Sequence, residues 1–242
     1  MKKKKKTLLI ATMALSTAAN FASARHNVDP AHSDNCVQRL ITNNMENEYI
    51  YLGSDAFAEY NECLYGAVLT YSMNNSHLIT DDKDYKIMVQ EMFDSIIETY
   101  DGDDLIRLGR GRLPGKLINS KILTHSGNDL IYLSNVNACT VSAGKGSDMV
   151  LISGNIYDLD LDMGRGDDVA ILASNLPLRG QNQIETTVID MGPGHDILKL
   201  RGSEDSYNIE ENGNETYISY KKSSSSAELI ILKNCDEITF LK

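Results

Sequence analysis

The sequence lacks the signatures of the common enzyme classes. It contains no His-Glu-x-x-His zinc-protease motif, no Gly-x-Ser-x-Gly nucleophile elbow and no Gly-x-x-x-x-Gly-Lys phosphate loop. The five histidines are scattered along the chain, at His26, His32, His77, His125 and His195. Of these, His125 and His195 fall in repeated turns, where they are either close to a metal or simply exposed. The missing motifs favour a protein that acts by binding over an enzyme.

Positive charge is also scarce. The chain has 23 Lys and Arg against 34 Asp and Glu, for a formal net charge of -11. Removing the five lysines of Lys2 to Lys6 lowers that charge to -16. Such a field repels nucleic acid and anionic lipid, so a nucleic-acid partner is not expected. The only basic cluster in the acidic part is Arg107, Arg110 and Arg112, which either contacts an anionic partner or is simply solvated.

Long apolar runs are limited to one, Thr7 to Ala19. It lies between the lysines and Ala22-Ser23-Ala24, which predicts a secretory signal peptide over residues 1–24. The run is shorter than the roughly 20 residues that span a bilayer, and no later segment is longer. We therefore expect a secreted, extracellular protein that passes through the periplasm and is not an integral membrane protein.

Cysteine is sparse, and no Cys-x-x-Cys occurs, which disfavours a zinc cluster or a thioredoxin-like centre. Export would place the four cysteines where disulfides persist. The favoured pairs are Cys36 with Cys63 and Cys139 with Cys235. Buried free thiols are the alternative.

Residues 35–100 show helical periodicity, within a predicted helical domain of residues 25–100. One helix is expected from Ser54 to Met73, and a second from Asp81 or Asp82 to Tyr100. Apolar residues recur in the second at three and four positions, from Tyr85 through Met88, Val89 and Met92. That stripe is either a partner-binding groove or an ordinary core. The pattern predicts a small N-terminal helical domain.

After Tyr100 the pattern changes to a repeat of Gly, any residue, Asp and a short apolar run. Its aspartates are 25, 19, 20 and 28 residues apart: Asp104, Asp129, Asp148, Asp168 and Asp196. A fixed period of this length is typical of stacked coils. Each interval holds two strands, so residues 101–202 are expected to form a solenoid of about five coils.

The segment between two aspartates shows how a coil is built. Alternation over residues 157–163 directs Tyr157, Leu159, Leu161 and Met163 inward and the three intervening aspartates outward, Asp158, Asp160 and Asp162. Those aspartates are either a surface cation site or a solvated face. The turns at residues 109–115 and 176–182 are enlarged by proline and glycine, and such protruding loops often carry contacts.

Residues 203–242 leave the repeat. Asn212-Gly213 is a strong hairpin signal between two β-forming segments, Tyr207 to Ile209 and Thr216 to Tyr220. Because a coil stack needs its open end covered, this segment is expected to be a C-terminal β cap.

The repeated turn offers oxygen ligands. Ca²⁺ takes six to eight oxygens and accepts both carboxylates and backbone carbonyls. Glycines permit the positive φ that points several carbonyls at one spot. Stacked aspartates would repel each other without a cation, so the repeat predicts a column of calcium sites.

The units resemble the RTX, or hemolysin-type, calcium-binding repeat Gly-Gly-x-Gly-x-Asp-x-apolar-x, whose fold is a parallel β-roll. The best matches are Ala143 to Asp148, Met163 to Asp168 and Met191 to Asp196, which keep the second and third glycines. The resemblance implies Ca²⁺ at Asp148, Asp168 and Asp196, with the glycines of the same turns, Gly144, Gly146, Gly164, Gly166, Gly192 and Gly194. Tyr100 and His125 replace the second glycine near Asp104 and Asp129. These two turns therefore match the calcium-binding motif less well than the other three. One motif per coil implies a single ion-bearing edge.

The sequence therefore predicts an α+β protein with a small N-terminal helical segment, a parallel β-roll and a C-terminal β cap. The expected function is that of a secreted calcium-binding RTX-like protein, an adhesin or toxin-related virulence factor with an unknown extracellular or cell-surface partner. One alternative is a calcium-dependent polysaccharide-degrading enzyme that uses Arg107, Arg110 or Arg112 as its basic residue. The other is a metal-free structural β-solenoid.

Overall fold

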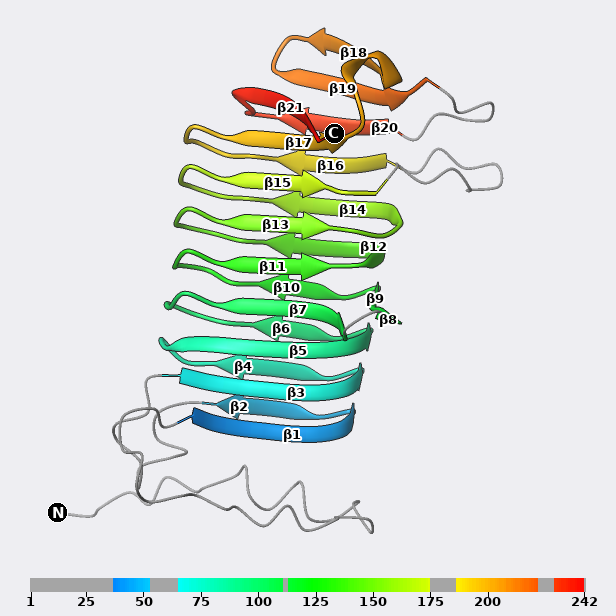
Figure 1. The fold of residues 1–242 in the computed structure, drawn as a ribbon. Coiled ribbons are helices and arrows are strands. Elements are labelled where there is room, and N and C mark those ends of the chain that lie inside the picture. The colour runs from blue at the N-terminus through cyan, green and yellow to red at the C-terminus, as the bar shows by residue number, and fades with distance from the viewer. Residues whose placement is uncertain (1–36, 53–64, 111–112, 175–185, 222–228, 242) are drawn as a thin grey trace, which may run out of the picture.

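The computed structural model describes residues 37–52, 65–110, 113–174, 186–221 and 229–241 of the 242-residue chain. These residues form a stack of β coils that rises from β1 to β21 (Figure 1). Each coil adds one strand to each of two parallel ladders, and both ladders belong to one hydrogen-bonded system. The predicted signal peptide and the predicted Cys36–Cys63 pair lie outside the described residues.

The first ladder, ladder 1, holds the strands that follow the repeated turns. Each strand pairs in parallel with the corresponding strand of the next coil. Its strands are β1 (Val37–Glu46), β3 (Tyr65–Asn74), β5 (Asp84–Phe93), β7 (Leu105–Arg110), β11 (Leu130–Leu133), β13 (Met149–Ile152), β15 (Val169–Leu172), β17 (Ile197–Arg201) and β21 (Glu237–Leu241).

Ladder 2 holds the strands that lead into the turns, again in parallel. Its strands are β2 (Tyr49–Leu52), β4 (His77–Thr80), β6 (Ile96–Glu98), β10 (Lys121–Leu123), β12 (Asn135–Ser142), β14 (Ile156–Asp162), β16 (Thr186–Asp190) and β20 (Leu229–Lys233). The short β9 (Lys116–Ile118) joins the two ladders by pairing with the end of β5 and the start of β12. β8 (Leu113–Pro114) folds back antiparallel on β7.

Both ladders direct alternate side chains into one core. β11, β13 and β15 repeat the same pattern, in which every second residue is buried. The buried members stack one above another from coil to coil, as Ile106, Ile131, Val150, Ala170 and Leu198 do in ladder 1. Coil stacking thus buries apolar surface that one coil could not bury alone.

The predicted N-terminal helices are wrong. Residues 84–93 form β5 and residues 96–98 form β6, while the part of the first predicted helix from Tyr65 onward lies in β3. The rest of that first helix lies outside the described residues. In β5 the buried residues Tyr85, Ile87 and Val89 follow a period of two. Tyr85, Val89 and Met92 also fit a helical stripe, so periodicity alone could not distinguish a strand from a helix. The segment is a strand because its backbone pairs with the coils on both sides.

The coil stack continues through the position where a domain boundary was predicted. β3 pairs with β5, and β5 pairs with β7, across Tyr100. Among the described residues, the parallel coil stack therefore extends back to β1, well before the Gly-x-Asp repeat.

The corner opposite the repeated turns is made by residues in the left-handed conformation. They form a column with φ between 46° and 54°, comprising Asn47, Asn75, Asp94, Asn119, Ala138 and Asp158. Asn and Asp tolerate this conformation better than other side chains. The corner shifts the alternation in β14: Leu159, Leu161 and Met163 are buried as predicted, but Tyr157 is only partly buried. Asp158, Asp160 and Asp162 face outward as predicted.

A column of small hydroxyl side chains lies just after this corner. Ser76, Ser95 and Ser120 each donate their hydroxyl to the carbonyl two residues earlier. Cys139 takes the next place in the column, and its thiol donates to the carbonyl of Asn137. The predicted Cys139–Cys235 disulfide is therefore wrong: both are free thiols, and Cys235 lies in the turn between β20 and β21.

We expect Cys139→Ser to be nearly neutral, because serine makes the same hydrogen bond one coil away. The unfolding free energy should change by no more than about 1 kcal/mol, while Cys139→Leu should cost about 1–3 kcal/mol through overpacking. Thermal melts of both variants provide the test. A larger loss for serine than for leucine would contradict this assignment.

The C-terminal segment covers the end of the stack. β18 (Tyr207–Asn212) and β19 (Glu215–Tyr220) form an antiparallel hairpin, entered through the 3-10 turn Glu204–Ser206. β19 pairs antiparallel with β20, while β20 and β21 add a further coil to the two ladders. No helix among the described residues is long and apolar enough to cross a membrane.

Candidate functional site

The Gly-x-Asp turns all lie on one edge of the stack, where ladder 2 passes into ladder 1 (Figure 1). The five repeat aspartates form a column that we call the aspartate column. Within it each backbone N–H donates to Oδ1 of the aspartate in the following coil, over 2.7–2.8 Å, from Asp104 to Asp129, Asp148, Asp168 and Asp196. The structure thus brings together all five predicted aspartates.

The second carboxylate oxygen of each aspartate, Oδ2, takes no part in these hydrogen bonds. The five side chains are at most 2% exposed, and each Oδ2 is buried without a hydrogen-bond partner. A buried, unpartnered carboxylate oxygen is costly, and natural structures contain few. A proton or a cation is needed to neutralise this column.

Burial raises the pKa of every carboxyl in the column. For Asp104 and Asp148 the pKa rises from 3.8 to about 7, and for Asp129 and Asp168 it rises to about 6. The pKa of Asp196 is raised as well. Loss of solvation is the main cause, and neighbouring carboxylates add to it. The amide hydrogen bonds to Oδ1 oppose it in part, as do the hydroxyls of Thr99 at Asp104 and Thr124 at Asp129. Near neutral pH the column is therefore poised between its protonated and ionised forms.

The glycines are needed because successive turns approach too closely for a side chain. A Cβ on Gly166 would lie 1.6 Å from the carbonyl oxygen of Gly146, and one on Gly164 would lie 1.8 Å from that of Gly144. The same holds for Gly146, Gly192 and Gly194. The predicted glycines thus line the same edge as the aspartate column and set the spacing of its coils.

The middle residue of each Gly-x-Asp turn forms a second, exposed column. Here the N–H of one residue donates to the side-chain oxygen of the preceding coil: Asp103 to Asp84, Asn128 to Asp103, Ser147 to Asn128 and His195 to Asp167. His195 itself is exposed. The variable position of the motif therefore favours short side chains with an acceptor oxygen.

Two residues that the repeat did not reveal close the aspartate column. Tyr85 donates its N–H to Oδ1 of Asp104, and Asp236 accepts the N–H of Asp196 through Oδ2 at 2.8 Å. Asp236 immediately precedes β21, as each column aspartate precedes its strand, but no glycine stands two residues before it. That missing glycine is why the motif did not identify it.

Tyr100 and His125 stand where the later turns have their second glycine. Their rings stack on each other, with centroids 5.1 Å apart and planes 10° apart. His125 adopts a positive φ of 60°, and the N–H of Lys145 donates to its carbonyl. The aromatic pair therefore replaces the glycines without breaking the turn.

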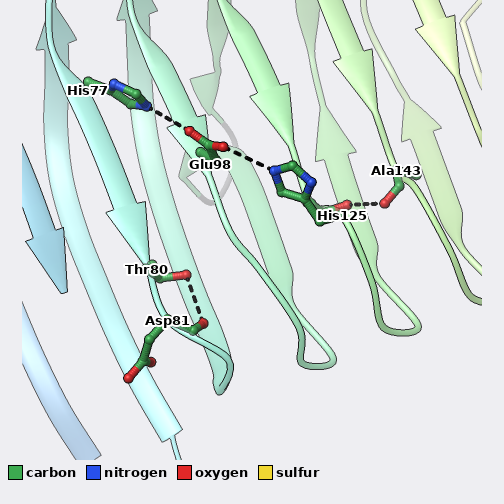
Figure 2. A network of polar contacts seen from close by, with 7 residues as sticks. His77, Thr80, Asp81, Glu98, His125 and Ala143 are labelled. Atoms are coloured by element: carbon green, nitrogen blue, oxygen red, sulfur yellow. Dashed lines mark hydrogen bonds and ion pairs between the residues drawn. The ribbon is translucent and has the colours of Figure 1, made fainter. Parts of the chain in front are cut away.

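The His125 side chain points to Glu98 rather than into the turn. Figure 2 shows Glu98 between two imidazoles: His77 Nε2 lies 3.2 Å from Oε2, and His125 Nε2 lies 3.1 Å from Oε1. Tyr49 packs edge-on against the His77 ring. This cluster links successive coils of ladder 2, and it uses the two oxygens of Glu98 separately.

The aspartate column offers one free carboxylate oxygen per coil. No set of three His, Cys, Asp or Glu side chains placed to hold a metal is found in the described part of the chain. A Ca²⁺ ion at this edge would take its remaining oxygens from the turn backbone, as the flexible coordination of Ca²⁺ allows. What the structure shows at this edge is five buried, stacked Oδ2 atoms without a hydrogen-bond partner.

No protein-family model matches the chain, and no curated protein is significantly similar to it.

Proposed function

We propose that this chain is a secreted calcium-binding β-roll of the RTX type that acts by binding an extracellular or cell-surface partner. The observation that carries the proposal is the row of five buried Oδ2 atoms without a partner, one for each Gly-x-Asp turn. Asp148, Asp168 and Asp196, with the glycines of their turns, are the principal sites, and Asp104 and Asp129 extend the column.

Local charge supports this proposal. The exposed column adds further carboxylates beside the buried one, among them Asp84, Asp103 and Asp167. Burial is the main cause of the raised pKa of Asp129 and Asp168, and these neighbouring carboxylates add to it. Divalent cations neutralise such a cluster directly. Secretion would expose the protein to media in which Ca²⁺ is available.

A metal-free structural solenoid is the second candidate, and a different observation favours it. Each Oδ1 already accepts an amide N–H from the neighbouring coil, so the column joins the coils without an ion. In that case the raised pKa values mean that protons neutralise the column. The two candidates differ in what happens when Ca²⁺ is added.

The test is a thermal melt of the wild type and Asp148→Asn at pH 7.5, in EDTA and in Ca²⁺. Asparagine keeps an acceptor for the N–H of Asp129 but removes the ionisable group. We expect Ca²⁺ at about one hundred times its dissociation constant to raise the wild-type Tm by about 5–10 °C, and Asp148→Asn to reduce that gain.

Asp160→Asn is the matched control, because Asp160 is an outward-facing aspartate of β14 outside the column. It should leave the calcium response unchanged. If Ca²⁺ shifts neither Tm nor heat in a calorimetric titration at millimolar concentration, the calcium proposal fails. The metal-free solenoid is then favoured.

A further inference from the structure

An insertion follows β7, at the end of the strand away from the aspartate column. This insertion leaves the regular coil path between β7 and β9, and its returning arm β8 pairs antiparallel with the end of β7. Beside it lies a cleft of about 510 Å³. Insertions in repeat proteins commonly form their binding face.

The two ends of the insertion meet at Gly109 and Gly115, where the backbones approach closely. A Cβ on Gly109 would lie 2.7 Å from the amide nitrogen of Gly115, and a Cβ on Gly115 would lie 2.5 Å from that of Gly109. The two backbones therefore touch. Because this contact fixes where Leu113 and Pro114 stand, one wall of the cleft has a defined position.

The floor of the cleft is the outer face of ladder 1. Arg107, Tyr132 and Leu151 occupy the same register in β7, β11 and β13, so their side chains stand side by side about 4.8 Å apart. Arg107 is exposed and has no carboxylate within ion-pairing distance among the described residues. The cleft thus presents a free guanidinium next to an aromatic ring.

Two hydroxyls complete the lining. Ser134 and Ser153 donate to the carbonyls of Leu108 and Leu133, at 3.4 and 3.2 Å, which leaves their lone pairs free to accept. The backbone of β11 is paired on both sides, to β7 and β13. A peptide therefore cannot add to this sheet as a strand, and recognition must use side chains.

We propose that this cleft binds a carboxylate-bearing saccharide. Tyr132 would stack on a sugar ring, Arg107 would pair with the carboxylate, and the serine oxygens would accept sugar hydroxyls. Arg107 is the only charged residue among those that line the cleft, so in this acidic protein the cleft selects for an anionic group, while the flat ring selects for a cyclic one. The proposal names a partner class for the binding role above, but its site is separate from the aspartate column.

The test is calorimetric titration of the purified protein in EDTA with trigalacturonate, the neutral trisaccharide maltotriose and triglutamate. Working in EDTA separates this proposal from calcium uptake, which is measured independently. We expect trigalacturonate to bind, maltotriose to bind at least about tenfold more weakly, and triglutamate to bind no better than maltotriose.

Variants localise the site. Arg107→Gln and Tyr132→Ala should each weaken trigalacturonate binding by about tenfold or more, whereas Tyr132→Phe retains the ring and should retain binding. Lys199→Gln is the matched control, because Lys199 lies in the same row of ladder 1 but outside the cleft. A Tm within a few degrees of wild type confirms that each variant is folded.

Three results would overturn the proposal: no trigalacturonate binding, equal binding by Arg107→Gln, or equal binding of triglutamate. The last would assign the cleft to acidic peptides. If trigalacturonate does not bind but Ca²⁺ does, only the saccharide proposal fails. If trigalacturonate binds but Ca²⁺ does not, only the calcium proposal fails.

Discussion

Without calcium, the protein is expected to lose stability as the pH rises from 5.5 to 7.5, with a fall in Tm of about 10 °C. Four column carboxyls, those of Asp104, Asp129, Asp148 and Asp168, have folded-state pKa values of about 6 to 7, raised from 3.8 mainly by burial. In this window the folded chain holds protons that the unfolded chain has already lost. Folding is therefore favoured at low pH, and the advantage disappears as the pH passes the folded-state pKa values.

The measurement is a series of thermal melts in EDTA across that pH range. Each proton held only by the folded state contributes a slope of up to about 1.4 kcal/mol per pH unit. Asp148→Asn combined with Asp168→Asn should flatten the profile, because two titrating groups are removed. Asp160→Asn should leave the profile as in the wild type, and a flat wild-type profile would contradict the assignment of the raised pKa values.

Calcium should reverse this pH dependence. A cation competes with protons for the same carboxylates, so calcium binding should tighten from pH 5.5 to pH 7.5 and release protons. Titrations in two buffers of different ionisation enthalpy would measure that release. Proton release that is absent while calcium still binds would place the ion elsewhere.

The second large effect is expected for Gly166→Ala. The added Cβ would lie 1.6 Å from the carbonyl oxygen of Gly146, and φ at Gly166 is 144°, which alanine avoids. The two coils must then separate, and this breaks the Asp148–Asp168 hydrogen bond across the same turns. We expect a loss of more than about 4 kcal/mol in unfolding free energy, beyond the range of ordinary point mutations.

Gly213→Ala is the matched control. Gly213 also has a positive φ, of 66°, but an added Cβ there meets nothing within 4 Å. Only the conformational strain applies, so the loss should be about 1–2 kcal/mol. Chemical denaturation of both variants gives the comparison, and equal losses would show that close stacking of the turns is not the reason for the glycines.

The spacing of the five repeat aspartates could be predicted from the sequence because the Gly-x-Asp turns share the same three requirements. Gly146, Ser147 and Asp148 supply a glycine without room for a side chain, a short exposed residue whose N–H donates to Asn128 of the preceding coil, and a buried carboxylate. Where a requirement is met by other residues, the sequence pattern disappears. Asp236 and Tyr85 hold column positions without the glycine, and β5 looks helical because its apolar residues fit two periods.

The chain's local chemistry thus located the repeated turns, the alternation of residues 159–163 and the C-terminal hairpin, since each depends on neighbouring residues. Stacking decided the rest. Parallel pairing with adjacent coils made strands of residues 84–93, placed Cys139 in a hydroxyl column away from Cys235, and buried five Oδ2 atoms without partners. The physical reason is that these features arise between residues about one coil apart, where hydrogen bonds and burial depend on the neighbouring coil rather than on the adjoining residues.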